Sequence, residues 1–202
     1  IMPLVPPNTI AGSGKLVSQV RPPPPFHAAR LAGIGNVIIT QAAGEKVRVE
    51  ADDNIVDSIT TEVHDGTLRI GLKEASCDSV TVNIQISVRK LDAAVLEGDG
   101  GFEAAAPIGC RSLYLAINGA GSMRFSGTAD ELSIQLNGMG EVQCLRMVAE
   151  KCSVRISGMG ECEVNASREL DALIAGTGQI VYEGEPAVIR KRVTGMGRIT
   201  KK

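Results

Sequence analysis

The chain has 202 residues, of which 44% are hydrophobic and only 2% are aromatic, with 23 glycines and no tryptophan. Its formal net charge is −2, and lysine and arginine are scattered over the chain as a whole, which argues against a dedicated nucleic-acid surface. No span approaches the roughly 20 apolar residues that a membrane helix needs.

The segment 1–28 is rich in proline and glycine. Proline removes backbone donors and glycine favours disorder, so residues 1–28 are predicted to form an extended leader outside the core. A proline-run ligand for an aromatic groove is the alternative to a spacer, and residues 17–20 can pair as an edge strand. Because the chain begins with Ile1 rather than methionine, we expect that an upstream segment has been removed, a signal peptide being one candidate.

Residues 29–95 show strand-like alternation of irregular spacing. The segment LAGIG at 31–35, followed by NVII, has the form of the later repeats and predicts a displaced coil. The segment HDGT at 64–67 lies between two alternating stretches and predicts a hairpin. Asp52, Asp53 and Asn54 interrupt the alternation, and a solvated turn is favoured over a calcium site because three adjacent residues do not build a six-oxygen shell. Little or no helix is expected.

One short sequence motif recurs from residue 96 onward. The pattern Gly-x-Gly begins at Gly119, Gly138, Gly158, Gly176 and Gly195, so the copies follow one another at nearly constant spacing. A looser copy begins at Gly98, one repeat before the first. The spacing is about 20 residues, which is the length of one coil of a β-solenoid.

Apolar and polar residues alternate on both sides of each glycine pair. Counting back in steps of two from the pair at 138–140 gives Leu136, Ile134 and Leu132, and counting forward gives Val142. Alternation places one side of a strand in a core and the other in water, so each repeat is predicted to be strand, glycine corner, strand and turn. A coil of ~20 residues at ~3.3 Å per residue has a perimeter of roughly 65 Å, enough for a triangular coil.

These patterns predict an all-β fold, a single-chain parallel β-helix over 29–202, with irregular strands at 29–95 and regular repeats at 96–202. In the last repeat, Lys191 and Lys201 replace apolar residues at inward positions. Terminal repeats need a polar face to prevent end-to-end stacking, so Lys191, Lys201 and Lys202 are predicted to cap the helix. A frayed terminus is the alternative.

The cysteines are five, an odd number. Three of them, Cys144, Cys152 and Cys162, occupy inward strand positions. We interpret these three as small buried hydrophobic residues rather than disulfide partners. The other two are Cys77 and Cys110.

The repeated corner has functional interpretations as well as a structural one. Nucleotide-binding loops also use Gly-x-Gly, but they place phosphate at a helix N-terminus, and here a strand follows each copy. Met139, Met159 and Met196 could form a row of thioethers for copper or a soft contact ridge; a structural corner with incidental methionine is the simpler interpretation. Asn118 and Asn137 stand at equivalent positions and predict a stabilising amide ladder.

Candidates for catalysis are few. Glycan-cleaving β-helices need paired carboxylates, or a base with neighbouring cations, on one face. Asp99, Glu141 and Glu161 could line one edge, but Gln179 and Arg198 complete that row, so a mixed ladder is predicted. Two histidines are too few for a multi-histidine metal site. We therefore predict no catalytic, cofactor-binding or metal-ligating residues.

An ordered series of motifs carries a family resemblance. GIG at 33–35, VEADDNI at 49–55, VHDGTLRI at 63–70 and the later Gly-x-Gly copies resemble the bacterial family described as putative auto-transporter adhesin, head GIN domain, from about Phe26 to the C-terminus. The resemblance implies a right-handed parallel β-helix on exported or envelope-anchored proteins, an adhesive role and no established catalysis. The family offers no agreed catalytic residues to transfer. This chain has methionine where the family more often has the serine of Gly-Ser-Gly.

Together these observations predict a non-enzymatic β-helix in the periplasm, on the outer membrane or secreted. Its surface would serve adhesion, scaffolding or self-association, toward an unidentified glycan or protein. A pectin-lyase-like β-helix that binds or cleaves carbohydrate is the alternative. We expect no nucleic acid, no cofactor and no membrane-spanning segment, and a homo-oligomer is left open.

Overall fold

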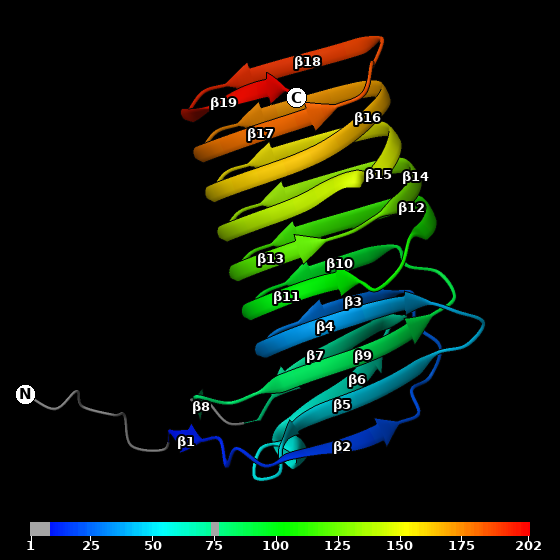
Figure 1. The fold of residues 1–202 in the computed structure, drawn as a ribbon, viewed down its shortest axis with the longest axis vertical. Coiled ribbons are helices and arrows are strands. Elements are labelled where there is room, and N and C mark those ends of the chain that lie inside the picture. The colour runs from blue at the N-terminus through cyan, green and yellow to red at the C-terminus, as the bar shows by residue number, and fades with distance from the viewer. Residues whose placement is uncertain (1–8, 74–76) are drawn as a thin grey trace, which may run out of the picture.

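The computed structural model describes residues 9–73 and 77–202 and shows an all-β solenoid (Figure 1). Residues 1–8 of the predicted leader lie outside the described residues. The single short helix of the described part is the 3-10 helix η1 (Val56–Ser58). The strands are β1 (Ile10–Ala11), β2 (Leu16–Arg21), β3 (Ala28–Leu31), β4 (Ile34–Gln41), β5 (Lys46–Asp52), β6 (Ile59–His64), β7 (Thr67–Leu72), β8 (Cys77–Asp78), β9 (Val82–Val88), β10 (Ala93–Leu96), β11 (Asp99–Ala104), β12 (Ile108–Ile117), β13 (Ala120–Arg124), β14 (Gly127–Leu136), β15 (Met139–Ile156), β16 (Met159–Ile174), β17 (Thr177–Glu183), β18 (Val188–Val193) and β19 (Met196–Lys201).

From β10 onward the chain winds in coils that stack in parallel. We call the two long sides wall 1 and wall 2. Wall 1 contains β3, β10, the ends of β12, β14, β15 and β16, and β18. Wall 2 contains β4, β11, β13, the beginnings of β15 and β16, β17 and β19. A short third side pairs residues 108–110, 127–129 and 147–149. The predicted β-solenoid and the length of its coils are confirmed, and its handedness stays a prediction.

The displaced coil predicted at 31–39 is present. Strand β3 pairs in parallel with β10, so that Leu31 lies opposite Leu96, and β4 pairs with β11, so that Gly35 lies opposite Gly100. The coil therefore stacks directly on one that begins only at Ala93. The residues between these two coils do not form a regular coil, and the chain returns to the solenoid at Ala93.

Those intervening residues build an irregular N-terminal end. Wall 2 continues through β9, which is parallel to β4, and then through β5 and β2, which are antiparallel. Wall 1 continues through β7 and β6, which form the predicted hairpin, with positive φ at Asp65 (48°) and Gly66 (71°). Strand β2, at Leu16–Arg21, is the edge strand considered for residues 17–20. Phe26, within the segment assigned to the leader, is buried.

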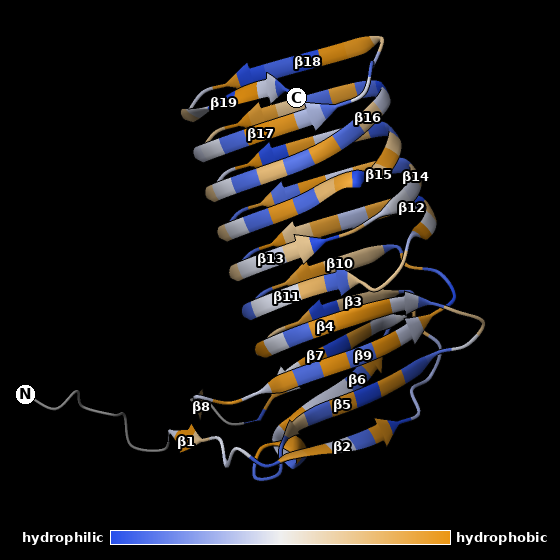
Figure 2. Cartoon of the chain, in the orientation of Figure 1, coloured by the Kyte–Doolittle hydropathy of each residue, from blue (hydrophilic) through white to orange (hydrophobic). Residues whose placement is uncertain are grey.

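The core consists of stacked columns of apolar side chains between the walls. Along each strand the hydrophobic and hydrophilic residues alternate, as Figure 2 shows. Because a single coil encloses almost nothing, stability comes from the stacking of each coil on its neighbours. One wall 1 column, buried throughout, is Leu31, Leu96, Ile117, Leu136, Ile156 and Ile174.

Glycine is required at the corner because adjacent coils approach there backbone to backbone. A Cβ atom added at Gly138 would lie 2.0 Å from the carbonyl oxygen of Gly119, and one added at Gly140 would lie 2.0 Å from that of Gly121. Because both contacts are with backbone atoms, no rearrangement of side chains can relieve them. The corner predicted from the repeats is thus explained by lack of room for any side chain.

The last coil is formed by the two strands β18 and β19. The ammonium group of Lys191 donates a hydrogen bond to the Tyr182 hydroxyl at 2.8 Å and lies 4.3 Å from the centre of its ring. Lys202 pairs with Glu183 at 3.2 Å, and Lys201 pairs with Glu185. The predicted cap residues thus sit on the preceding coil.

Candidate functional surface

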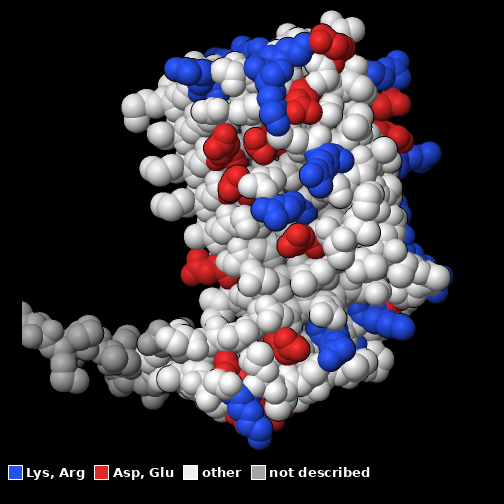
Figure 3. Space-filling model, viewed as in Figure 1, with Lys and Arg blue, Asp and Glu red and all other residues white. Residues whose placement is uncertain are grey.

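The glycine corners carry a ridge of exposed methionines. Strand register places Ala120, Met139, Met159, Thr177 and Met196 in one column along the edge where wall 1 turns into wall 2. Met139, Met159 and Met196 are 59%, 53% and 71% exposed. Uncharged side chains protrude along this edge in Figure 3. The methionines are therefore not core residues, and their exposure fits both interpretations offered by the sequence, incidental corner residues and a soft contact ridge.

The amide ladder predicted beside this ridge is present. The side-chain amide of Asn137 donates to the side-chain oxygen of Asn118 at 2.8 Å. Both residues directly precede the first glycine of a corner. The bond ties two coils together on the surface, so this pair has a stabilising role.

The outer surface of wall 2 is hollowed where small residues stack. Gly101 lies opposite Asn36 in the coil before it and opposite Ser122 in the coil after it. A Cβ at Gly101 would lie 2.8 Å from the Ser122 carbonyl oxygen, so a larger residue does not fit without a shift. Side chains of the neighbouring positions, including Glu103 and Arg124, line the hollow.

A hydrogen-bonded network borders that hollow. Arg124 donates through Nε to Gln143 at 2.8 Å, and Gln143 donates to Glu141 at 2.5 Å. On the other side, a guanidinium nitrogen of Arg124 lies 3.9 Å from a carboxylate oxygen of Glu103. Four side chains from three successive coils are thus held in a fixed arrangement facing solvent. Such preorganised polar groups beside a depression are what a binding surface requires.

A second depression adjoins the first on the way to the third side. It is lined by residues 103–107, by Arg124, Phe125 and Ser126, and by Leu145, Arg146 and Glu163. The loop between β11 and β12 forms one rim. The two depressions share Glu103, Arg124 and Gln143, so the polar network lies between them.

Wall 1 differs because several of its outer charges pair with each other across adjacent coils. Arg30 contacts Glu97 at 2.6 Å, and Lys151 contacts Glu131 at 3.5 Å. Arg190 pairs with Glu169, which holds the pKa of this exposed guanidinium above its ordinary value. Exposed pairs of this kind contribute little to stability, because solvent screens them.

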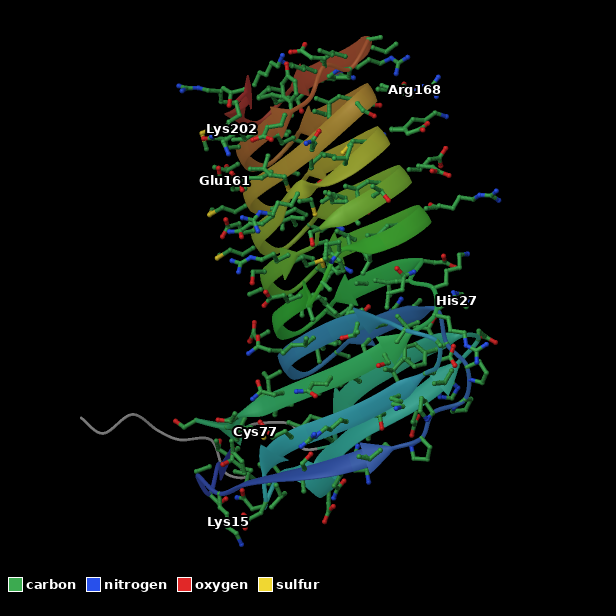
Figure 4. The ribbon with its side chains drawn as sticks, turned by 45° about the vertical axis from the view of Figure 1, so that its right-hand side comes forward. Lys15, His27, Cys77, Glu161, Arg168 and Lys202 are labelled. Atoms are coloured by element: carbon green, nitrogen blue, oxygen red, sulfur yellow. The ribbon has the colours of Figure 1, made fainter. Side chains whose placement is uncertain are left out.

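The carboxylates considered for catalysis do not form one row. Glu141, Glu161, Gln179 and Arg198 stack in a single column of wall 2, as predicted for a mixed ladder. Asp99 is the exception, since it pairs with Ala120 and therefore lies in the neighbouring ridge column. Glu161 and Arg168 lie on opposite edges of the solenoid in Figure 4.

The two histidines lie near the N-terminal end and each contacts an acidic residue. His27 Nδ1 lies 3.2 Å from Asp92, and His64 Nε2 lies 3.2 Å from Glu62. Among residues 9–73 and 77–202, no three His, Cys, Asp or Glu side chains come together as metal ligands would. In the same part of the chain, no helix is long and apolar enough to cross a membrane.

The three inward cysteines are buried, as predicted, and they form no disulfide. Burial raises the pKa of the Cys144 thiol to about 12 and raises the pKa values of Cys152 and Cys162 as well. Cys110 is half-buried, and desolvation raises its pKa to about 11. These thiols are therefore poor nucleophiles near neutral pH.

The acidic turn at 52–54 has a structural role that the sequence did not reveal. Asp52 is 2% exposed, and its carboxylate accepts hydrogen bonds from the backbone N–H of Gly14 at 2.7 Å and of Thr81 at 2.8 Å. The predicted solvated turn is thus wrong for this residue. Asp53 accepts from the Ser13 hydroxyl at 2.6 Å, which lowers the pKa of its carboxyl. Asn54 donates to the Ala11 carbonyl at 2.8 Å. The turn clips residues 11–14 onto the domain.

The fold and its surfaces define a class of protein: a β-solenoid with patterned outer walls and a glycine-cornered edge. Solved structures share this fold. A putative adhesin from Bacteroides fragilis matches with a TM-score of 0.80 at 22% identity, over 96% of this chain and 100% of that one. A putative adhesin from Parabacteroides merdae matches with a TM-score of 0.53 at 19% identity, over 97% and 100% of the two chains. A putative lipid binding protein from Parabacteroides distasonis matches with a TM-score of 0.52 at 21% identity, over 96% and 99%.

The family follows from the sequence match. The model of the putative auto-transporter adhesin, head GIN domain, matches residues 25–186. The chain belongs to this family, which confirms the resemblance found in the motifs. The matched residues end before β18. No curated protein matches the chain.

Proposed function

We propose that the chain is a non-catalytic protein of the cell envelope, or a secreted one, that holds a protein or glycan ligand on wall 2. The observation that carries this proposal is the hollow at Gly101 with its bordering network of Glu103, Arg124, Gln143 and Glu141. On wall 1, by contrast, Arg30, Lys151 and Arg190 pair with acidic residues of adjacent coils. Membership of an adhesin family and the likeness to structures of putative adhesins support an adhesive role outside the cytoplasm.

The geometry favours binding over catalysis. Glycosidases place two carboxyl groups on either side of the bond that they cleave, within a cleft that positions the substrate. Glu141 and Glu161 instead stack on the same column of an open wall, and Glu141 accepts a hydrogen bond from Gln143. The carbohydrate alternative gains little support from the aromatic residues. All three phenylalanines and Tyr182 are buried, which leaves the partly exposed Tyr114 as the one aromatic side chain that a sugar could reach.

The test is a screen of the purified chain against glycans and matrix proteins, followed by a pair of matched variants. Arg124→Ala removes the centre of the wall 2 network, and Arg155→Ala removes another exposed arginine, from wall 1. For any ligand found, we expect Arg124→Ala to weaken binding about tenfold or more, as loss of an anchoring arginine does, and Arg155→Ala to change it less than about twofold.

The outcomes separate the competing roles. Equal weakening by both variants, or weakening by Arg155→Ala alone, would contradict the assignment to wall 2. Release of new reducing ends from a polysaccharide would contradict the non-catalytic proposal. A silent screen together with a defined oligomer in light scattering would favour a scaffold instead.

A further inference from the structure

The last coil differs in charge from the rest of the molecule. Of the 21 lysine and arginine residues, six lie within 188–202, where none of the 23 aspartate and glutamate residues lies. The segment 188–202 therefore carries a formal charge of +6, and since the whole chain carries −2, the segment 1–187 carries −8. The even scatter of cations expected from the whole sequence does not hold here. Figure 3 shows basic side chains gathered at this end and mixed charges along the wall below it.

Large apolar side chains are exposed on the same coil. Val188, Ile189, Val193 and Met196 are 41%, 45%, 43% and 71% exposed. Ile189 and Val193 continue core columns, opposite Leu170 and Ile174, but no coil covers them. Between them stands Lys191, at an inward position, so a further coil stacked here would have to bury an ammonium group.

The cations surround these apolar residues on both walls. Arg192 lies on wall 1, opposite Leu173, and Arg198 lies on wall 2, opposite Gln179. Among the described residues, neither guanidinium forms an ion pair with a carboxylate. Arg190, Lys201 and Lys202 do face acids of the preceding coil. Even with those three neutralised, a net excess of three positive charges remains at this end.

The combination identifies the chemistry of a partner. A second copy meeting this end with its own last coil would bring two cationic surfaces together and enclose Lys191, which has no carboxylate partner among the described residues, and this is costly. A soluble polyanion would use the arginines but leave the apolar side chains in water. An anionic bilayer surface satisfies both, since cations are attracted to its phosphate groups and apolar side chains enter the headgroup boundary.

We propose that residues 188–202 dock the solenoid end-on to an anionic membrane surface. Arg192 and Arg198 contact the lipid phosphates, and Ile189, Val193 and Met196 insert at headgroup level. The contact stays shallow because the outer edges of β18 and β19 carry unpaired backbone groups, which need water or headgroup partners and are not tolerated in hydrocarbon. Wall 2 then runs away from the membrane, with its hollow open to solvent.

The experiment is vesicle co-sedimentation with the whole chain. Neutral phosphatidylcholine vesicles are compared with vesicles containing about one third phosphatidylglycerol, at low and at high salt. We expect binding only to the anionic vesicles and loss of most of it at high salt, because exposed charges are screened. The double variant Arg192→Glu with Arg198→Glu should lose at least ~25-fold in affinity, since each cation near an anionic surface contributes about fivefold.

Two further variants keep the test specific. Arg111→Glu with Arg155→Glu makes the same change in net charge at two exposed arginines of the middle coils, and it should lower the affinity for vesicles less than about threefold. Val193→Ser with Met196→Ser should weaken vesicle binding while leaving binding to soluble polyphosphate unchanged.

Equal losses from the two charge-reversal variants, or no binding to anionic vesicles, would overturn the proposal. Binding to polyphosphate but not to vesicles would show that the last coil binds a soluble polyanion. A concentration-dependent dimer that is lost with Arg192→Glu would show that it binds a second copy of the chain. Either result would also overturn the proposal. Circular dichroism confirms that each variant is folded.

Discussion

The regular coils and the N-terminal end share one hydrophobic core but hold together differently. In the coils, each strand pairs in parallel with a strand one repeat away, and the closest contact is backbone on backbone at Gly138 and its equivalents. At the N-terminal end, β2, β5 and β9 pair antiparallel, and a buried carboxylate, Asp52, fixes the earlier segment around Gly14.

This difference has a physical basis. A repeated coil propagates because each copy presents the next one with the same backbone and the same apolar column. The first coil has no predecessor, so its outer edge must be covered by something that does not repeat. Antiparallel strands and side-chain clips to loop backbone serve this purpose, and they depend on individual residues rather than on a pattern.

The largest expected effect comes from breaking the coil contact. Gly138→Val places side-chain carbon where only 2.0 Å separates an added Cβ from the Gly119 oxygen. We expect a loss of about 3–5 kcal/mol in the free energy of unfolding, or failure to fold, because the backbone must shift. Met139→Ala, at the exposed neighbouring position, should change it by about 0.5 kcal/mol or less. Chemical denaturation measures both.

A glycine with open space provides the control for that prediction. Gly44 has no atom within 4 Å of an added Cβ, so Gly44→Ala should be close to neutral. Equal destabilisation by Gly138→Val, Met139→Ala and Gly44→Ala would contradict the corner model.

An intermediate effect is expected at the N-terminal clip. Asp52→Ala leaves the N–H groups of Gly14 and Thr81 without their acceptor, and losing hydrogen bonds to a buried charged group costs about 2–3 kcal/mol. Asp53→Ala removes an exposed carboxylate next to it and should cost less. Hydrogen exchange should show faster exchange at Gly14 and Thr81 in Asp52→Ala, while amides of β15 and β16 keep their protection. If Asp52→Ala reduced hydrogen-exchange protection only in β15 and β16, the assignment of Asp52 to the N-terminal end would be contradicted.

The smallest expected effect is a pH dependence that belongs to the coils. Burial raises the pKa of Cys144 to about 12, above its ordinary value of 9.0. The folded state therefore favours the neutral thiol, and its contribution to stability is complete below pH 9 and is lost as the pH rises toward 12. Between pH 8 and 10.5, we expect ionisation of the Cys144 thiol to lower the free energy of unfolding by about 2 kcal/mol.

The matched measurement uses Cys144→Ala, which should show a shallower fall over the same pH range. Hydrogen exchange in the N-terminal end should change less with pH than exchange in β15 and β16, since Cys144, Cys152 and Cys162 all lie in those two strands. An identical pH slope for the variant would contradict the assignment.

The periodic pattern predicted the coils, their inward columns, the burial of three cysteines and the displaced coil at 31–39. It succeeded because pairing within a solenoid repeats at the length of one coil, so every copy adds to the same signal. The hairpin at 64–67 was predictable for a related reason, since its turn chemistry is local. The amide ladder also followed from the register.

Only the tertiary structure decided which surface features matter. The sequence predicts that Asp52 is an exposed turn residue. In the structure, residues 11–14 and the loop before β9 bury its side chain, and it anchors these segments. The hollow at Gly101 depends on Asn36, which is distant in the chain and stacks beside it only because the intervening residues leave the solenoid. The docking surface proposed for the last coil depends on which side chains have no coil above them. Each of these features arises from contacts between segments with no shared period, and for such contacts a sequence gives no signal in advance.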